Sequence, residues 1–216
     1  DADIDLAVEG AMLAKMRNLG EACTAANRFY IASNVAPEFI EKFKKRMAVL
    51  KVGNGLDPTV DVGPLVNADT RNKVAAFVKD ALDKGAKLEL GGKMPIGKGF
   101  YYPPTILSNV SSDAGCVHDE IFGPVAAIQT FDDEADLITR ANDTEYGLVA
   151  YVFTKDLKRG LAISEKLDYG MVGLNRGLVS DPAAPFGGTK QSGLGREGGH
   201  EGMLEFMESQ YISVEW

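Results

Sequence analysis

Two periodicities of apolar residues alternate along the chain. Ile4 and Val8 fall on one face of a helix, which predicts a helix over residues 4–20 with Asp3 as its N-cap and Gly20 at its end. The same pattern predicts further helices at residues 37–50, 69–84, 133–142, 157–167 and 202–207. Aromatic and β-branched runs predict strands at residues 27–32, 86–90, 105–110, 125–131, 147–153, 170–175 and 210–216.

This alternation predicts an α/β domain, in which helices cover a mostly parallel sheet as a three-layer α/β/α arrangement. Residues 147–153 are apolar throughout, which is typical of a strand buried on both faces of such a sheet. No helix follows the strand predicted at residues 210–216. We therefore expect that strand to lie at an edge and to pair with another subunit.

Composition and charge exclude several classes of function for this chain. The 216 residues carry a net charge of −8, and no basic cluster stands out, which argues against a nucleic-acid partner. No apolar run approaches the length of a membrane span, and no signal-like segment opens the chain. The two cysteines, Cys23 and Cys116, do not make a disulfide framework, so we expect free thiols in a reducing compartment such as the cytoplasm.

Cys23 is the first candidate for chemistry. A lone cysteine is usually a small core hydrophobe, and that interpretation remains open for Cys23. However, Gly20 precedes it and small residues follow it, a context that presents a thiol at a helix-to-loop break beside free backbone amides. The only histidines are His118 and His200, and neither lies nearby in sequence to act as a base. This favours chemistry in which another group, or the substrate, activates the thiol.

Four ordered motifs carry a resemblance to a known family. Residues 17–28, Arg-Asn-Leu-Gly-Glu-Ala-Cys-Thr-Ala-Ala-Asn-Arg, closely resemble the active-site cysteine motif of the aldehyde dehydrogenase superfamily. The other matches are Glu-Ile-Phe-Gly-Pro-Val at 120–125, Asn-Asp-Thr-Glu-Tyr-Gly-Leu at 142–148, and the glycine-dense segment 185–197. The resemblance implies the C-terminal half of such an enzyme, with a catalytic domain at residues 1–197 and an oligomerisation tail at 198–216.

We therefore expect a longer protein, because the chain also begins at Asp1, directly in helical periodicity. The resemblance places the N-terminal cofactor domain, the general base and an oxyanion-binding Asn before Asp1. On that view the 216 residues alone have no dehydrogenase activity, and the full protein is a homodimer or homotetramer. The residues that choose between NAD and NADP would also lie in that missing half.

The resemblance implies a mechanism and a cofactor site. The Cys23 thiolate would attack an aldehyde, the thiohemiacetal would pass a hydride to NAD or NADP, and water would hydrolyse the resulting thioester. Glu120 would accept hydrogen bonds from ribose hydroxyls, and Phe122 would pack near the nicotinamide. We expect no metal site. Ala25 stands where some relatives carry a second, redox-active cysteine, so no such switch is expected.

Three further positions indicate the class of substrate. In succinate-semialdehyde dehydrogenases, residues matching Arg17 and Ser180 bind the distant carboxylate, and Phe186 would line the pocket. A guanidinium suits a carboxylate because its planar fork pairs with both oxygens. We therefore expect oxidation of succinate semialdehyde to succinate. Glu21 and Leu19 depart from the residues common in relatives, and either departure would alter the pocket or only the packing.

Two residues are expected to have no catalytic role, and other functions stay open. Glu89 lies in a Glu-Leu-Gly-Gly-Lys sequence like the family's general-base motif, but it follows Cys23 in sequence, whereas the family's base precedes the cysteine. Cys116 has no assigned role and is expected to be structural. The alternatives are a dehydrogenase for another carboxylate-bearing or general aldehyde, an acyl-phosphate reductase of the same fold, and a module that only oligomerises.

Overall fold

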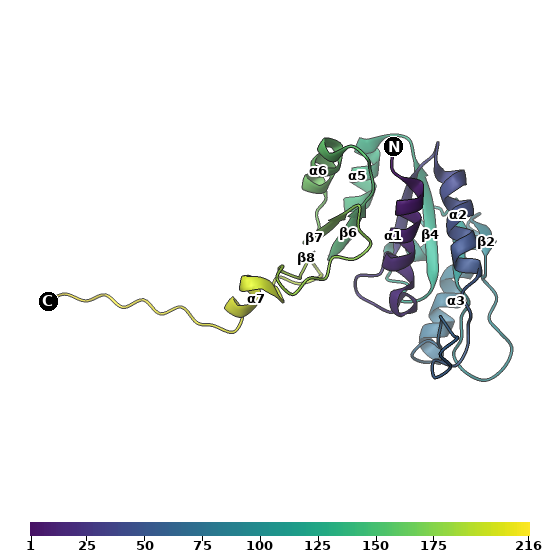
Figure 1. Cartoon of the computed structure of the whole chain (residues 1–216), viewed down its shortest axis with the longest axis horizontal. Helices are drawn as coiled ribbons and strands as arrows, with labels where there is room; N and C mark the ends of the chain where they lie inside the picture. The colour runs from purple at the N-terminus through teal and green to yellow at the C-terminus, as the bar shows by residue number, and fades with distance from the viewer.

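The computed structural model describes residues 1–216 as helices packed around parallel strands (Figure 1). The helices are α1 (Ile4–Met16), the 3-10 helix η1 (Arg17–Gly20), α2 (Ala36–Ala48), α3 (Ala68–Asp83), α4 (Gly115–His118), α5 (Glu134–Asn142), α6 (Leu157–Lys166) and α7 (Gly199–Leu204). The strands are β1 (Arg28–Ala32), β2 (Lys87–Leu90), β3 (Thr105–Ser108), β4 (Val125–Phe131), β5 (Tyr146–Gly147), β6 (Val149–Val152), β7 (Met171–Leu174) and β8 (Thr189–Lys190). None of these helices has both the length and the apolar character that a membrane span requires.

The strands form one main sheet and two small ones. The main sheet has the order β1-β4-β3-β2, with β4 parallel to both β1 and β3, and β2 antiparallel at the edge. Separately, β6 pairs in parallel with β7, and β5 pairs antiparallel with β8. The predicted α/β class with mainly parallel strands is confirmed, but the parallel strands are divided between two sheets.

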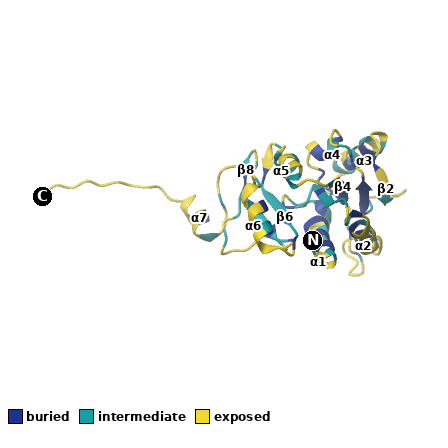
Figure 2. Cartoon of the chain, turned by 90° about the horizontal axis from the view of Figure 1, so that it is seen from above, coloured by how far each residue is buried: buried dark blue, intermediate teal, exposed yellow.

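Helices cover both faces of the main sheet, which gives the expected three layers (Figure 2). Because successive side chains of a strand point to opposite faces, β3 and β4 supply two separate cores. One core joins Ile106 and Ile128 to α1 and α2, with Phe43 fully buried at its centre. The other joins Leu107 and Val125 to α3 and α4.

The end of α1 determines where the cysteine turn begins. Asp3 caps the helix, and its side chain accepts a hydrogen bond from the Leu6 N–H at 3.2 Å, as predicted. Asn18, Leu19 and Gly20 then take positive φ values of 49°, 46° and 80° in succession. A Cβ at Gly20 would lie 2.3 Å from the Gly123 carbonyl oxygen, so only glycine fits this position.

Several predicted elements differ from the observed ones. The continuous strand expected at 147–153 is split into β5 and β6, and β6 is only half-buried because β7 is its sole partner. No helix was predicted at Gly115–His118, where α4 forms, and the helix expected at 202–207 begins earlier, after Gly198 turns the chain with a φ of 65°. Residues 210–216 form no strand within this chain, and their pairing with another subunit stays a prediction.

Lys15 is a charged residue inside the apolar interior. Its side chain is 1% exposed, at the end of the same α1 face that buries Val8 and Ala11. Burial lowers the pKa of Lys15 to about 7, although the negative charge of Glu120 acts in the opposite direction. The folded chain therefore holds this proton much more weakly than the unfolded chain does.

We predict that replacing Lys15 by Met stabilises the chain at pH 7 and that the gain fades as the pH rises. The unfolded chain binds the Lys15 proton up to about pH 10.5 and the folded chain only to about pH 7, so the free energy of unfolding rises with pH between these values. Urea unfolding should show a Lys15→Met gain of roughly 2–4 kcal/mol at pH 7 that shrinks towards pH 10. The exposed Lys45→Met is the control, and a pH-independent gain would contradict the prediction.

Candidate active site

Cys23 lies on a short turn between η1 and β1. The Ala25 N–H donates to the Ala22 carbonyl at 2.9 Å, and the Ala26 N–H donates back to Ala14 of α1 at 3.0 Å. The thiol is exposed and lines a cavity of about 580 Å³. The Cys23 N–H donates to no protein acceptor, so it is free to bind an oxyanion formed next to the sulfur.

Arg17 is held beside the cysteine turn. Its guanidinium Nη2 donates to the Thr24 hydroxyl at 2.9 Å, while the rest of the exposed side chain faces solvent. Thr24 is itself buried, and its carbonyl accepts a hydrogen bond from the Tyr151 hydroxyl at 3.0 Å. Burial raises the pKa of Tyr151, and the nearby Arg17 charge opposes that shift. The arrangement places a guanidinium next to the residue that follows Cys23.

Glu120 reaches the same cavity from a distant part of the sequence. The side chain of Asn27 joins the two segments: its amide nitrogen donates to the carbonyls of Cys116 and Asp119 at 3.0 and 3.1 Å, and its oxygen accepts from the Ile121 N–H at 2.9 Å. The exposed Glu120 lines the cavity together with Cys23. Asn27 therefore sets the position of the Glu120 loop relative to the cysteine turn.

Phe122 adopts a φ of 54°, a conformation that non-glycine residues rarely take. It is half-buried between buried neighbours and does not line the cavity. Ser180 is exposed and Phe186 is half-buried, with the Phe186 backbone paired to Glu197 in both directions at 2.7 Å. Neither lines the cavity. The structure thus brings Cys23 and Glu120 to one cavity, whereas Arg17, Phe122, Ser180 and Phe186 do not line it.

The structure gives local explanations for the two departures noted in the cysteine motif. The Glu21 carboxylate accepts a hydrogen bond from the Val66 N–H at 3.1 Å, which ties the turn to the segment before α3. Leu19 packs against the core between α3 and the sheet. Both residues therefore serve the packing of this turn.

The two residues expected to have no catalytic role have structural ones. Cys116 is completely buried, and burial raises its pKa to about 11. Glu89 lies on β2, at the opposite edge of the main sheet from β1, where it accepts from Ser108 at 2.6 Å and pairs with Lys87 at 2.9 Å. No group of three or more His, Cys, Asp or Glu side chains could hold a metal ion.

Sequence reasoning missed three residues around the site. Tyr151 is the only tyrosine within the apolar run 147–153, which was a signal that its hydroxyl needs a partner. Asn27 lies inside the cysteine motif itself, where an amide side chain can hold neighbouring backbone groups by hydrogen bonds. Lys15 falls on the apolar face of α1, four residues after Ala11, a position where a lysine is unusual.

Comparisons with known proteins show the family of this chain. Residues 1–212 match the aldehyde dehydrogenase family. A succinate-semialdehyde dehydrogenase of Paenarthrobacter nicotinovorans is 52% identical over 99% of this chain and 48% of that protein. A glutarate-semialdehyde dehydrogenase of Pseudomonas aeruginosa is 47% identical over 99% of this chain and 44% of that protein.

The fold agrees equally well with solved structures. A crystal structure described as an Escherichia coli NADP dependent enzyme superposes with a TM-score of 0.94 at 47% identity, covering 96% of this chain and 43% of that one. The chain thus spans about half the length of the curated relatives it matches. With a family match over nearly every residue, the chain belongs to the aldehyde dehydrogenase family.

Proposed function

We propose that this chain is the cysteine-bearing half of a nicotinamide-dependent enzyme that oxidises succinate semialdehyde to succinate. One observation carries the proposal: the Arg17 guanidinium is anchored on Thr24, the residue that follows the exposed Cys23. A cation held by the residue after the nucleophile suits an aldehyde that carries its own carboxylate. The high identity to a protein named succinate-semialdehyde dehydrogenase supports the same substrate.

Cys23 is the proposed nucleophile. Its thiolate forms a bond to the carbonyl carbon of the aldehyde, and the carbonyl oxygen becomes an oxyanion that the free Cys23 N–H can bind. Loss of a hydride from that carbon leaves a thioester on the sulfur. Water then attacks the thioester, which releases the acid and returns the thiol. The base that activates the water is proposed to lie on the half of the protein that precedes Asp1.

Glu120 is the proposed contact for the cofactor. Its carboxylate is exposed, lines the cavity with Cys23, and offers two oxygens to a pair of ribose hydroxyls, so it fits the sugar of a nicotinamide dinucleotide. Such a cofactor supplies an acceptor for the hydride. Asn27 and the Lys73 amine, which donates to the Glu120 carbonyl at 3.2 Å, hold the loop in place. Phe122 is proposed to pack near the nicotinamide.

Arg17 is the proposed anchor for the far carboxylate of the substrate. One of its N–H groups already binds Thr24, which fixes the guanidinium plane and leaves other donors for the ligand. Ser180 and Phe186 are proposed to complete the pocket. A second candidate substrate is glutarate semialdehyde, one methylene longer, because a protein named for it is nearly as similar to this chain.

The proposed division of the chain is a catalytic domain at residues 1–197 and a tail at 198–216 that pairs with another copy in a homodimer or homotetramer. Figure 1 shows the residues after α7 extending away from the rest of the chain. The tail's large apolar side chains are almost fully exposed, at 93% for Phe206 and 90% for Tyr211. Exposed apolar side chains of this kind are typical of a surface that another chain covers.

We predict that iodoacetamide modifies Cys23 and spares Cys116 in the folded chain. Cys23 is exposed, whereas Cys116 is buried and its raised pKa of about 11 leaves almost no thiolate at pH 8. Mass spectrometry after timed labelling should give a rate ratio of at least about a hundredfold. Cys23→Ser should abolish the fast phase, and equal labelling of both thiols would contradict the prediction.

We predict that Arg17→Ala in the full-length protein weakens binding of the carboxylate-bearing substrate selectively. Loss of a charge-assisted hydrogen bond should raise KM for succinate semialdehyde by roughly tenfold to a hundredfold, with little change for butanal, which is uncharged and of equal chain length. Steady-state kinetics with both aldehydes provide the measurement. Arg46→Ala, which removes an exposed arginine of α2, is the control. Equal effects on both aldehydes would refute the substrate assignment.

We also predict that the 216-residue chain alone does not reduce NAD or NADP in the presence of succinate semialdehyde. The reason is that the base and most of the cofactor site are proposed to lie outside these residues. Absorbance at the nicotinamide band is the measurement, with the full-length protein as the positive control. Turnover by the 216 residues would show that they contain a complete site.

A further inference from the structure

Thr24, the residue after Cys23, joins two distant parts of the chain. It is only 3% exposed, yet its hydroxyl and its carbonyl both have partners. The hydroxyl accepts a hydrogen bond from the Arg17 guanidinium at 2.9 Å, and the carbonyl accepts one from the Tyr151 hydroxyl at 3.0 Å. Thr24 therefore connects the proposed substrate anchor to a tyrosine that lies 127 residues later in the sequence.

The Arg17 side chain depends on this one contact. The bond to Thr24 is the only hydrogen bond that the guanidinium makes within the chain, and no Asp or Glu pairs with it. Arg17 is exposed and lies directly after the last turn of α1, where the backbone leaves the helix. A long exposed side chain samples many rotamers unless a bond holds it. The direction of the guanidinium is therefore set by the position of the Thr24 hydroxyl.

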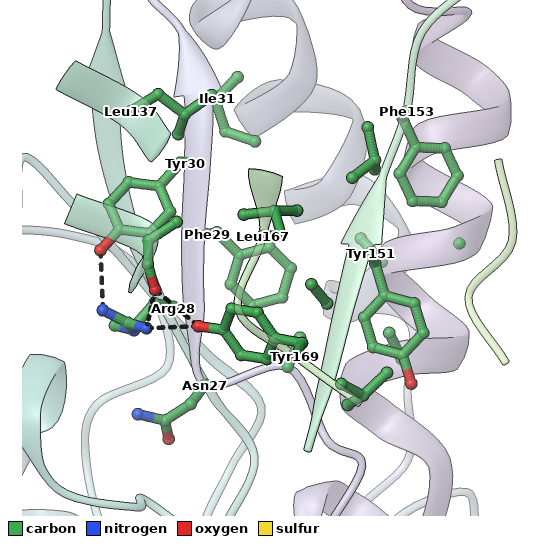
Figure 3. A pocket seen from close by; sticks show the side chains of 18 of the residues that line it. Asn27, Arg28, Phe29, Tyr30, Ile31, Leu137, Tyr151, Phe153, Leu167 and Tyr169 are labelled. Atoms are coloured by element: carbon green, nitrogen blue, oxygen red, sulfur yellow. Dashed lines mark hydrogen bonds between the residues drawn. The ribbon is translucent and has the colours of Figure 1, made fainter. Parts of the chain in front are cut away.

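Tyr151 is held in place by the small sheet and not by the cysteine turn. It pairs with Gly173 in the register of β6 and β7, and a Cβ at Gly173 would lie 3.0 Å from the Tyr151 ring. The absence of a side chain at Gly173 thus leaves room for the ring. Figure 3 shows the ring at the border of the cavity, on the other side from Arg28. The small sheet therefore carries a hydroxyl that holds the Thr24 carbonyl from outside the turn.

The electrostatic surroundings of the Tyr151 hydroxyl agree with this position. Burial raises the pKa of Tyr151, whereas the bond to Thr24 and the charge of Arg17 lower it. A negative charge on Cys23 acts in the same direction as burial. The phenol is therefore protonated at neutral pH and remains a hydrogen-bond donor. Both the guanidinium and the thiol are close enough to act on it.

We propose that Tyr151 and Thr24 are positioning residues that hold the Arg17 guanidinium where it favours a carboxylate-bearing reactant at the thiol. Neither residue needs to touch the substrate, because each acts through its hydrogen-bonded neighbour. Tyr151 fixes the Thr24 carbonyl, and the Thr24 hydroxyl fixes the guanidinium. The proposal rests on the proposed function, because it concerns the residues behind the substrate anchor.

The first test removes single hydroxyl groups from the full-length protein. Tyr151→Phe and Thr24→Val should each raise KM for succinate semialdehyde by about threefold to tenfold, with little change in kcat or in KM for butanal. Thr24→Ser keeps the hydroxyl and should retain the parent KM. Tyr101→Phe, in the loop between β2 and β3, is the control for loss of a tyrosine hydroxyl.

A double variant separates positioning from a general loss of packing. If Tyr151 acts through Arg17, Tyr151→Phe should change KM for succinate semialdehyde by less than about twofold once Arg17→Ala is present. Effects of the two substitutions that multiply, or an equal rise in KM for butanal, would overturn the proposal and would identify Tyr151 as a packing residue.

Alkylation of Cys23 tests the same residues without a substrate. Iodoacetate carries a carboxylate and iodoacetamide does not, but both react with the thiolate, so the ratio of their rates cancels any change in the thiol pKa. Arg17→Ala, Tyr151→Phe and Thr24→Val should each lower this ratio by about twofold to fivefold at low salt, and Thr24→Ser should not. Mass spectrometry of the Cys23 peptide from the full-length protein gives both rates.

The two measurements distinguish this proposal from the choice of substrate. If Arg17→Ala affects succinate semialdehyde and butanal alike, the substrate assignment fails, and the alkylation ratio decides the positioning role. A ratio that falls in Arg17→Ala but not in Tyr151→Phe or Thr24→Val would overturn the positioning role. A ratio that no variant changes would also overturn it, because the guanidinium would then have no effect on an anion at the thiol.

Discussion

The backbone of Gly20 rests directly on the carbonyl of Gly123, and the geometry around Cys23 depends on this contact. Because any side chain at Gly20 would collide with that carbonyl, the chain can turn sharply at the end of α1 and lie against the loop that follows Glu120. The three hydrogen bonds of Asn27 hold the same two segments together from the β1 side. The thiol and the carboxylate therefore reach one cavity although about a hundred residues separate them.

The interior around this turn contains a buried lysine and a buried cysteine in addition to apolar side chains. Lys15 is buried at the end of α1, and its charge is opposed by desolvation and favoured by Glu120. Cys116 lies in the neighbouring core, where burial disfavours its thiolate. The two cysteines thus have opposite environments, because Cys23 is exposed on a turn and Cys116 is buried. Exposure, and not residue type, makes Cys23 the candidate nucleophile and Cys116 a packing residue.

The division of the parallel strands between two sheets is the other main feature of the fold. β6 and β7 form a small sheet on which α6 packs. Two polar contacts connect this region to the cysteine turn and to β1: the Tyr151 hydroxyl donates to the Thr24 carbonyl, and Arg28 donates to the Tyr169 hydroxyl. The cleft between the two sheets is lined mainly by apolar side chains, and it reaches from Cys23 along β1 and β6.

Sequence alone determined the α/β class, most helix and strand positions, and the cysteine motif with its family, because these depend on local periodicity and on short runs of residues such as Gly20 to Asn27. Tertiary structure alone decided that β6 does not join the main sheet, that Arg17 binds Thr24, and that Tyr151 and Asn27 support the turn. It also left Arg17, Phe122, Ser180 and Phe186 outside the cavity. These outcomes depend on contacts between residues far apart in the chain, which no local pattern encodes. The motif around Cys23 was therefore predictable from the sequence, but the residues that contact it were not.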